Sequence, residues 1–426
     1  MCRPRARDVR RRTLLRGAVL APLAGPAAGC GDLARTTGLG DFVRVAVSWS
    51  AAELAAFDRV LDRRRVDDTE LVPLGDDIGA ALGAATTGRP DVVALPRPGL
   101  VTGNVEKLAP LPDEVWRDAY DRVWRPELPT RRHYALPFKI AHTSVVWYRR
   151  SVFAEHGLRP PDTWRDWLEL NESIIDRTGV APLAMGGGDG WVLAGFFANV
   201  LLRHFAGSYD ALLAPHDARL WTSGEVRAAF RMVADMWGRA GALSGGADRA
   251  LVQQFPDAVL EVFLYHRAAM VPAPDFAESV IRQFGVLTDD VGTFTFPAGP
   301  PGAPLVISGD LLVLTAPASP AATNLIRYLS TPDAPVPWIR DTGGFIAANP
   351  STDPRHYSPT LRRLAEDLRD NDVRFGLSDQ LGRLGGREGL QRVLQDMLRD
   401  LADGTPPHTA AETAAASMVE AEERTR

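Results

Sequence analysis

Hydrophobic and polar positions follow two different periods along the chain, and the two periods alternate. Residues 42–49 alternate apolar and polar positions as a half-buried strand does, and residues 51–65 then place apolar side chains at helical spacing. The order repeats, because strands are expected over 69–74 and 90–96 and a helix over 76–87. This β-α-β-α-β order predicts a mostly parallel sheet covered by helices, with ligands bound beyond the carboxyl ends of its strands.

A second series of strands and helices begins after Tyr134-Ala-Leu-Pro. In order, we expect a strand over 144–148, a helix that Asp162 or Thr163 N-caps, a strand over 181–185, a helix over 191–205, two weaker strands over 259–263 and 268–271, and an apolar strand over 305–314 that is broken at 308–310. Helical spacing then dominates up to an alanine-rich end that fits a surface helix. Because no low-complexity linker separates the two series, we expect two α/β halves that exchange strands.

The composition is that of a soluble globular protein. The chain has 426 residues, of which 45% are hydrophobic and 24% are charged, so two or three domains are expected and this composition disfavours a wholly disordered or polytopic membrane chain. Two cysteines cannot form a disulfide scaffold or a four-ligand zinc site, and the histidines do not include an HExxH pattern. We therefore expect neither a metal nor another cofactor.

The first 29 residues have the pattern of an export signal. An arginine-rich region runs through Arg16, and an apolar stretch that is too short to span a bilayer follows it up to Ala28. Arg11-Arg12-Thr-Leu-Leu resembles the twin-arginine signal, although a plain secretory signal with a chance arginine run is an equally open interpretation. Both interpretations predict that residues 1–29 direct export.

Cys30 is a predicted lipidation site. Pro26-Ala-Ala-Gly-Cys30 resembles a bacterial lipobox, with Ala27 where such motifs usually have Leu. Acyl chains on Cys30 would anchor the protein to the outer face of the cell membrane, with residues 30–41 as the tether. Since Cys2 is removed with the signal, we expect no disulfide in the mature chain.

The charge of the body differs from that of the signal. The first 29 residues hold seven arginines and one aspartate, so the remainder has a net charge of −11 against −5 for the whole sequence. A nucleic-acid grip needs a basic surface that releases phosphate counterions, so nucleic acid is not expected as a partner. The two lysines, Lys107 and Lys139, do not follow a glycine, which excludes a Walker A ATPase motif.

Four motifs follow one another within residues 133–191, and they are Tyr134-Ala-Leu-Pro, Val145-Val-Trp-Tyr-Arg, Phe153-Ala-Glu-His-Gly-Leu and Pro160-Pro-Asp-Thr-Trp. Together they resemble extracellular solute-binding proteins of carbohydrate ABC transporters. Further blocks are similar to the branch that handles α-glucoside-type sugars, and they lie at 45–57, 90–99, 309–310, 327–334, 338, 343–349 and 375–379. The blocks extend from near the mature start to near the C-terminus, and their order carries the resemblance.

The resemblance implies a fold of the periplasmic-binding-protein type II. Two α/β lobes, each a doubly wound and mostly parallel sheet, would be built from discontinuous segments and joined by a hinge. We expect residues 42–143 and 308–350 in the first lobe. Residues 144–307 and 351–420 would form the second lobe.

The function that the resemblance implies is sugar capture. A lipid-anchored, monomeric, non-enzymatic binding protein would close its lobes on an α-glucoside or other oligosaccharide and deliver it to ABC permease subunits. Ser308, Arg149 and Arg97 depart from the residues usual in the branch, so they bear on which sugar binds. Two alternatives stay open, namely an exported glycosidase, since carboxylates near tryptophans also describe one, and a ligand-presenting sensor on the same fold.

A sugar has apolar C–H faces and a rim of hydroxyls, so its site needs aromatic platforms and hydrogen-bonding carboxylates. Among ten tryptophans, Trp49, Trp147 and Trp191 lie at strand ends or beside the hinge and are the candidates, with core packing an open alternative for Trp147. Phe345, like Trp338, flanks a glycine turn and either faces the cleft or packs. Helical position favours core packing for the remaining candidates, Trp116, Trp124, Trp164, Trp167 and Trp237.

The polar candidates are Glu53, Arg97, Lys139, Asp189 and Asp310. Glu53 and Asp189 lie at helix starts, where stabilising the helix dipole and N-capping are the alternative explanations. Asp310 interrupts an apolar run, where a charge is costly unless it is paired or faces a cleft. Lys139 stands out in a chain that uses arginine almost everywhere, and Arg97 stands where the α-glucoside branch commonly has Gln.

Overall fold

The computed structural model describes most of one compact unit, Phe42–Arg426. The described residues are 42–49, 51–62, 69–83, 88–117, 120, 132–285, 288–297 and 302–425. The predicted export signal, the Cys30 lipidation site, the tether and Trp124 lie outside them.

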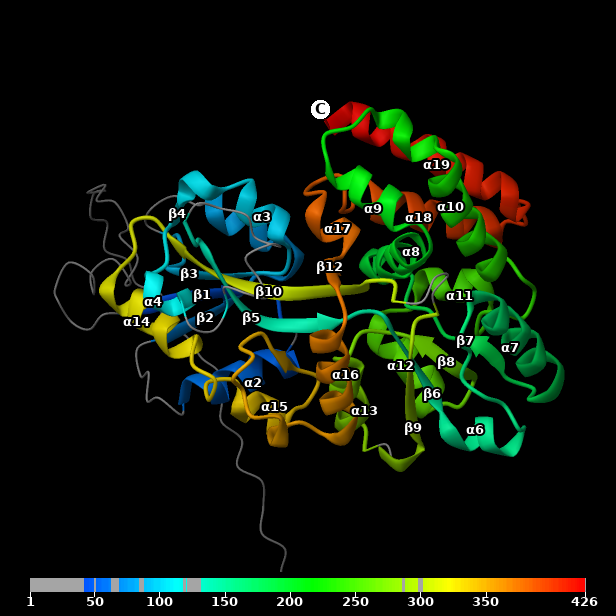
Figure 1. The fold of residues 1–426 in the computed structure, drawn as a ribbon, viewed down its shortest axis with the longest axis horizontal. Coiled ribbons are helices and arrows are strands. Elements are labelled where there is room, and N and C mark those ends of the chain that lie inside the picture. The colour runs from blue at the N-terminus through cyan, green and yellow to red at the C-terminus, as the bar shows by residue number, and fades with distance from the viewer. Residues whose placement is uncertain are drawn as a thin grey trace, which may run out of the picture. The chain divides into compact units, whose positions relative to one another are not determined.

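The larger of two sheets has β1, β2 and β3 near one edge and the long strand β10 at its centre (Figure 1). Its strands are β1 (Val43–Val47), β2 (Thr69–Pro73), β3 (Val92–Leu95), β4 (Leu108–Ala109), β5 (Ala135–His142), β10 (Leu305–Thr315), β11 (Ile346–Ala347) and β12 (Val373–Phe375). The order is β11-β5-β10-β3-β1-β2, with β12 and β4 also paired to β10. We call the part of the chain built on this sheet the first lobe.

The second sheet has the order β7-β8-β6-β9 and supports the second lobe. Its strands are β6 (Val145–Arg149), β7 (Ala181–Leu183), β8 (Ala268–Pro272) and β9 (Val291–Thr295). The sequence therefore predicted the α/β class and the two-sheet plan correctly.

The prediction of mostly parallel sheets was wrong, because both sheets are mixed. Strand β1 is parallel to β2 and β3, but β10 is antiparallel to β3, β4 and β5, and β6 is antiparallel to β8 and β9. The reason is that β10 returns from the second sheet and enters the first one from the opposite direction. Strand β10 continues without interruption through residues 308–310, where the sequence predicted a break. Its pairing with β5 shifts register between Asp310 and Leu311, directly after these polar residues.

Helices flank the sheets (Figure 1). They are α2 (Ala51–Asp62), α3 (Pro98–Thr102), α4 (Asp113–Arg117), α6 (Arg150–Glu155), α7 (Trp164–Arg177), α8 (Gly190–His204), α9 (Ala206–Leu213), α10 (Gly224–Trp237), α11 (Gly246–Val252), α12 (Phe255–Phe263), α13 (Ala277–Gln283), α14 (Pro320–Leu329), α15 (Val336–Asp341), α16 (Pro359–Asp370), α17 (Leu377–Gln380), α18 (Leu390–Ala402) and α19 (Pro407–Thr425). Short 3₁₀ helices are η1 (Gly75–Gly83), η2 (Val105–Lys107), η3 (Ala218–Thr222), η4 (Thr288–Asp290) and η5 (Pro354–His356).

Local chemistry explains where two of these helices begin. Thr163 N-caps α7, and its hydroxyl and the Asp166 carboxylate form a reciprocal capping box. The sequence had offered Asp162 or Thr163 as the cap, and Thr163 is the one that caps the helix.

The prediction of a strand over 259–263 was wrong, because these residues form the end of helix α12. Helix α12 is apolar on nearly every face and short, so its periodicity does not separate it from a buried strand, and Pro256 in its first turn marks a helix start.

The alanine-rich C-terminal helix α19 is a surface helix, as expected, and it packs one face against the protein. Ala410, Ala411, Ala414 and Ala415 are buried against α10, α18 and η3. Small side chains let these helices approach closely. The carboxylate of Glu422 accepts a 2.7 Å hydrogen bond from Trp221 Nε1, which ties the end of α19 to η3.

A short passage joins the two sheets, because β5 ends at His142 and β6 begins at Val145. Thr143 Oγ1 donates to the Val306 carbonyl at 2.8 Å, and Val306 N donates to Ser144 Oγ at 2.8 Å. The passage and the start of β10 are thus bonded to each other between the sheets (Figure 1). The sequence predicted that the chain passes from the first lobe (42–143) to the second lobe (144–307) at this point. The assignment of these segments to the two lobes stays a prediction.

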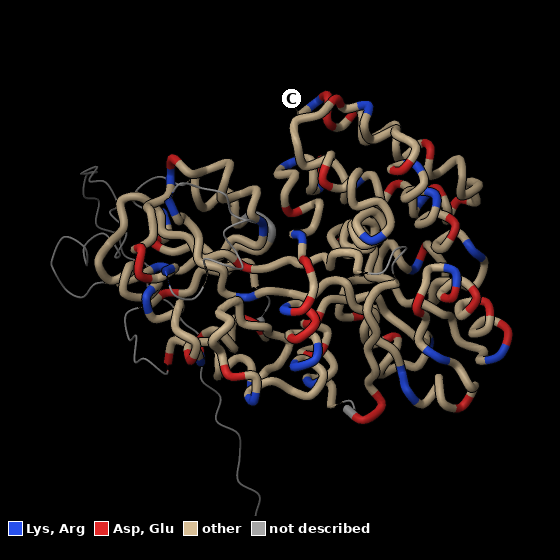
Figure 2. Tube along the Cα trace, in the orientation of Figure 1, with Lys and Arg blue, Asp and Glu red and all other residues tan. Residues whose placement is uncertain are grey.

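Acidic and basic residues are interspersed along the described chain (Figure 2). Several form exposed or half-exposed ion pairs, such as Arg44 with Glu70 at 2.9 Å and Arg327 with Glu114 at 3.0 Å. Exposed pairs contribute about 0 to 1 kcal/mol each, so apolar burial supplies most of the stability. Trp116, Trp167 and Trp237 belong to that buried core, as predicted, and Trp164 is partly buried beside Trp167.

The packing of α19 can be tested with two neighbouring alanines. Ala415 is buried and Ala416 is exposed. Ala415→Asp buries an unpaired carboxylate, so we expect it to lower the free energy of unfolding by more than about 2 kcal/mol. Ala416→Asp should change it by less than about 0.5 kcal/mol. Urea denaturation of both variants measures the difference, and equal stabilities would contradict the packed position of this helix.

Candidate functional site

The candidate site is a cavity of about 1110 Å³ lined by elements of both sheets. Seven of the nine predicted ligand contacts line it, and they are Trp49, Glu53, Arg97, Lys139, Asp189, Trp191 and Asp310. Whether they bind a ligand stays a prediction. Residues separated by more than 250 positions meet here, because β10 returns to lie beside β5.

Trp49, Glu53, Lys139 and Asp310 form one group, which we call the polar network. Lys139 on β5 and Asp310 on β10 are directly opposite each other across the antiparallel pair. Trp49 Nε1 donates to Asp310 Oδ2 at 2.9 Å, and Lys139 Nζ lies 2.6 Å from Glu53 Oε1. Lys139 is 4% exposed and Asp310 is 8% exposed. Two nearly buried opposite charges thus lie at the edge of the cavity, each with a partner.

Burial and charge act in opposite directions within the polar network. Burial disfavours the ammonium of Lys139, but the carboxylates of Glu53 and Asp310 outweigh burial and raise the lysine pKa. Burial raises the pKa of Asp310 to about 6, although attraction by Lys139 lowers it. Asp310 is therefore mostly ionised at neutral pH, and an ionised carboxylate is a strong acceptor for hydroxyl hydrogen bonds.

An aromatic wall borders the cavity on the side of the second lobe, and it consists of Trp191, Phe255 and Phe276. The ring centroids of Trp191 lie 5.3 Å from Phe255 and 5.8 Å from Phe276, and those of Phe255 and Phe276 are 5.0 Å apart. Lys139 Nζ lies 5.0 Å from the centroid of Phe276, within the range of a cation–π contact. The polar network and the aromatic wall therefore touch through this pair.

A third part of the lining comes from α17 and the turns after it. Burial raises the pKa of Asp379 to about 7, although the nearby Arg97 guanidinium lowers it. Arg383 also lines the cavity and pairs with Glu388 through two bonds of 3.0 Å. Arg97 thus favours the ionised form of a partly buried carboxylate beside the cavity.

Asp189 lines the cavity, but its side chain does not N-cap α8, which was the alternative explanation for this residue. It occupies the N-cap position of α8, but its side chain makes no capping bond there. Instead, Asp189 Oδ2 accepts a 2.6 Å hydrogen bond from Phe255 N, at the start of α12. Asp189 therefore fixes the position of Phe255 relative to Trp191, and it shapes the aromatic wall.

Trp147 and Phe345 do not line the cavity, which corrects two predicted contacts. Trp147 is fully buried, and its Nε1 donates to the carbonyls of Ala273 and Pro274 at 3.0 and 3.2 Å. Phe345 is fully buried as well, with its ring 4.9 Å from that of Trp338. Both side chains belong to the hydrophobic core, which was the alternative that the sequence left open for each of them.

Sequence reasoning missed Phe255, Phe276 and Asp379 as lining residues. Phe255 was not considered because the following segment was interpreted as a strand. Phe276 follows strand β8 after Pro274-Asp275, and a side chain just beyond a strand end was a usable signal. Asp379 lay inside a block quoted for the resemblance, but no argument from charge singled it out.

Two negative findings concern the residues that the structure describes. Among them, no group of three or more His, Cys, Asp and Glu side chains is placed to hold a metal ion. Within the same residues, no helix is both long enough and apolar enough to cross a membrane.

Comparisons with known proteins agree on one family. Residues 72–334 match the family model of bacterial extracellular solute-binding proteins. The chain is 27% identical over 322 residues to the osmoprotective compounds-binding protein GgtB of Synechocystis sp., covering 68% of this chain and 72% of that protein. It is also 27% identical over 328 residues to the alpha-glucosides-binding periplasmic protein AglE of Rhizobium meliloti, covering 70% of this chain and 69% of that protein.

Solved structures share the fold at low sequence identity. A maltose-bound MalE3 of T. maritima matches with a TM-score of 0.69 and 18% identity, covering 90% of this chain and 100% of that chain. A sugar transporter protein of Bacillus licheniformis in complex with stachyose matches with a TM-score of 0.68 and 17% identity, covering 89% and 100%. These structures confirm the two-lobed α/β fold.

The burial of Asp310 predicts a pH dependence of stability. Because the pKa of this carboxyl is raised to about 6 in the folded protein, folding favours its protonated form, and the wild type loses stability as the pH rises through 4 to 6. Asp310→Asn removes this loss. We expect the stability of Asp310→Asn relative to the wild type to increase between pH 4 and pH 7, by on the order of 3 kcal/mol.

Chemical denaturation at several pH values measures this difference. Asp162→Asn is the control, because Asp162 is exposed and lies outside the cavity lining. A stability difference between Asp310→Asn and the wild type that stays constant from pH 4 to pH 7 would contradict the buried, cavity-edge position of Asp310.

Proposed function

The chain belongs to the family of bacterial extracellular solute-binding proteins, and we propose that it captures a sugar between its two lobes and delivers it unchanged to an ABC transporter permease. The family binds solutes and does not transform them, so the chain is a binding protein and not an enzyme. The observation that carries the proposal is one cavity that holds both the polar network and the aromatic wall.

The two kinds of lining match the two kinds of surface that a sugar presents. Trp191 and Phe255 offer flat apolar area to the C–H faces of a pyranose ring. Asp310 and Glu53 offer carboxylate oxygens to its hydroxyl groups, and charge-assisted hydrogen bonds of this kind are stronger than neutral ones. Lys139 balances one of the two carboxylate charges of the polar network, and the carboxylate oxygens suit the hydroxyl groups of an uncharged ligand.

We propose an α-glucoside or another oligosaccharide as the ligand. The relative from R. meliloti is named for α-glucosides, and the chain is 27% identical to it. The T. maritima structure holds maltose, and the B. licheniformis structure holds stachyose. Arg97, Arg149 and Ser308 depart from the residues usual in the α-glucoside branch, and two of them, Arg97 and Ser308, line the cavity. Arg97 and Ser308 are therefore the positions at which this protein would differ from the α-glucoside branch in its ligand preference.

Capture would couple to closure of the two lobes. A ligand that contacts both lobes favours the closed form by the difference between its affinities for the closed and the open forms. A micromolar dissociation constant corresponds to about −8 kcal/mol, which a few stacked rings and several hydroxyl hydrogen bonds supply. The hydrogen-bonded passage at Thr143 and Ser144 would be the hinge.

We also propose that acylated Cys30 anchors the protein to the outer face of the cell membrane, and that residues 30–41 tether it. The lipobox-like Pro26-Ala-Ala-Gly-Cys30 supports this proposal. The anchor would keep the binding protein near a permease that a separate ATPase drives. A ligand-presenting sensor on the same fold is distinguished by its gene neighbours, since a receptor kinase would replace the permease genes.

Incubation with a saccharide panel tests the proposed function. We expect maltose, trehalose, sucrose or raffinose to raise the melting temperature of the purified protein and to remain intact afterwards, because a binding protein releases its ligand unchanged. Thermal shift and chromatography of the incubated sugar measure the two outcomes. Released monosaccharide would support the glycosidase alternative, and no response to any saccharide would contradict sugar capture.

Substitution of Trp191 tests the aromatic wall. Trp191→Ala removes the stacking surface, so we expect at least about tenfold weaker binding of the saccharide found in the panel. Trp191→Phe keeps a ring at this position and should retain most of the affinity. Calorimetric titration compares the variants, and an unchanged affinity of Trp191→Ala would contradict a role for the aromatic wall.

A further inference from the structure

The two lobes also contact each other beside the cavity. In the first lobe the turn Gly343-Gly344 follows α15, and in the second lobe α13 follows β8. Glu278 Oε2 on α13 accepts a 2.9 Å hydrogen bond from Gly344 N. Arg282 Nη2, one helical turn further along α13, donates to the Arg340 carbonyl at 3.1 Å. We call these residues the clasp, and they lie outside the set of residues that line the cavity.

The two halves of the clasp approach more closely than side chains on the turn would allow. A Cβ on Gly344 would lie 2.9 Å from Phe276 Cα, and a Cβ on Gly343 would overlap the Glu278 carboxylate and the Arg282 guanidinium. Both glycines also have positive φ, +73° at Gly343 and +61° at Gly344. The pair of glycines therefore permits this contact between the lobes.

The first-lobe half of the clasp is fixed to the elements that supply the polar network. Arg59 Nη2 on α2, the helix that carries Glu53, donates to Thr342 Oγ1 at 2.6 Å, directly before the turn. Trp338 on α15 packs against Trp49, with the ring centroids 5.1 Å apart. A displacement of the turn would therefore require a displacement of α2 or a loss of these contacts.

The second-lobe half of the clasp belongs to a helix that borders the cavity. Helix α13 and the residue before it line the cavity through Phe276, Ser279, Val280 and Gln283. Glu278 and Arg282 are four residues apart, so they share another side of the same helix. A shift of α13 that breaks the clasp therefore also moves residues of the cavity, including Phe276 of the aromatic wall.

The clasp lies close to the passage between the two sheets. His142 N donates to Asp275 Oδ1 at 3.1 Å, and Asp275 N donates to the His142 carbonyl at 3.1 Å, just before α13 begins. A rotation of the lobes about the passage would move the clasp by a small distance only. A hydrogen bond is lost, however, once its heavy atoms are about 3.6 Å apart. Even a small rotation would therefore open the clasp.

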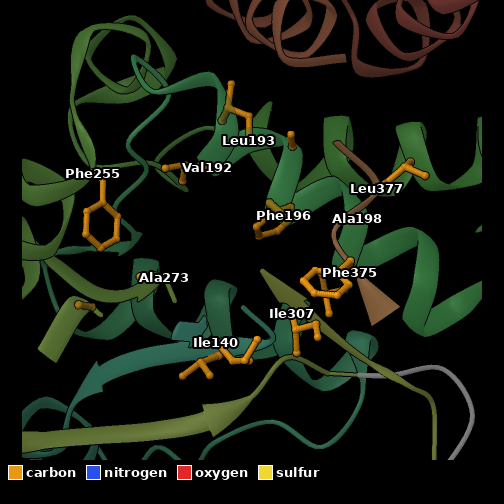
Figure 3. Close-up of a cluster of buried hydrophobic side chains, with 14 of the residues drawn as sticks. Ile140, Val192, Leu193, Phe196, Ala198, Phe255, Ala273, Ile307, Phe375 and Leu377 are labelled. Carbon is orange, nitrogen blue, oxygen red and sulfur yellow. The ribbon is translucent and has the colours of Figure 1, made fainter. Parts of the chain in front are cut away.

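Apolar side chains join the lobes as well, but they do so differently. Figure 3 shows a buried cluster in which Ile140 and Ile307 come from strands of the first sheet, and Phe196 and Phe255 come from α8 and α12. Apolar burial is not directional, whereas a hydrogen bond requires a defined distance and angle. The clasp is therefore the contact that is more specific for one arrangement of the lobes.

We infer that the clasp holds the lobes in the arrangement that places the polar network beside the aromatic wall, with or without a sugar, and that Glu278 is a positioning residue for sugar binding. Glu278 acts through α13 and Phe276 rather than through a contact with the ligand. The inference rests on the proposed function, to which it adds a control of affinity. The apparent dissociation constant rises as the binding-competent fraction falls, so a weaker clasp means weaker binding.

Small-angle X-ray scattering of the protein without sugar tests the clasp itself. Glu278→Ala and Arg282→Ala each remove one of its bonds, so we expect a larger radius of gyration than that of the wild type. Glu278→Gln keeps a side-chain oxygen that can accept the Gly344 N–H, and it should match the wild type. Arg165→Ala is the matched control for Arg282→Ala, because exposed Arg165 pairs with Glu169 on its own helix.

Calorimetric titration with maltose, trehalose, sucrose and raffinose tests the effect on affinity. For each saccharide that the wild type binds, we expect about tenfold weaker binding by Glu278→Ala and a change within about threefold for Glu278→Gln. At saturating saccharide the radius of gyration of Glu278→Ala should return to that of the liganded wild type, because the ligand then favours the same arrangement. A residue needed only for folding would not give this return.

Substitution of Gly344 opens the clasp from the other lobe. The methyl group of Gly344→Ala would meet Phe276 Cα, so we expect the same increase in radius of gyration and the same loss of affinity as for Glu278→Ala. Gly179→Ala is the matched control, because Gly179 also has a positive φ, +70°, but a Cβ there would meet no atom within 4 Å. Cooperative thermal unfolding of each variant would show that it is folded.

The outcomes separate the inference from the proposed function. Radii of gyration of Glu278→Ala and Gly344→Ala equal to that of the wild type would overturn the inference, and so would unchanged saccharide affinities. A loss of affinity that Glu278→Gln shares in full would also overturn it, since this variant keeps the acceptor oxygen. Binding of no saccharide by the wild type would overturn the proposed function, while scattering without sugar still decides whether the clasp holds the lobes.

Discussion

The pairing of Lys139 with Glu53 and Asp310 is the constraint on which the site depends. A buried ammonium or carboxylate is costly unless opposite charges and hydrogen bonds compensate it, so these groups must be brought together when the chain folds. They come from β5, α2 and β10, and only the antiparallel return of β10 beside β5 places Asp310 opposite Lys139. The same return produces the mixed sheet and carries the chain back from the second lobe. The carboxylates that line the cavity and the connectivity of the lobes therefore have one structural cause.

The two lobes contribute different chemistry to the cavity. The polar network belongs to elements on the first sheet, and the aromatic wall belongs to helices and loops around the second sheet. Lys139 lies over the Phe276 ring, so a direct contact already joins the two sets. In the proposed function, a ligand that needs both kinds of contact would bridge the lobes, and its binding energy would favour their closed arrangement. The separation of chemistry between the lobes would then couple recognition to closure.

Sequence reasoning located the polar network because its members break local patterns. Asp310 interrupts an apolar run, Lys139 is one of two lysines, and Trp49 and Glu53 lie where a strand passes into a helix. It placed Trp147 and Phe345 at the site incorrectly, because the pattern along a strand or turn does not tell which side chains the opposite lobe covers. The aromatic wall was only partly found, since Phe255 and Phe276 acquire their positions from the packing of α12 against β8 and against α13. The mixed strand directions also depend on long-range return of the chain, which local periodicity does not encode.

The sparse use of lysine has a practical consequence for labelling chemistry. Lys139 is almost completely covered and held by a carboxylate, whereas Lys107 lies at the partly exposed end of η2, bonded to Asn104 at 2.8 Å. Amine-reactive reagents would therefore discriminate strongly between the only two lysine side chains of the sequence. A fluorophore or surface linker attached through Lys107 would occupy a single defined position on the first lobe, outside the set of residues that line the cavity.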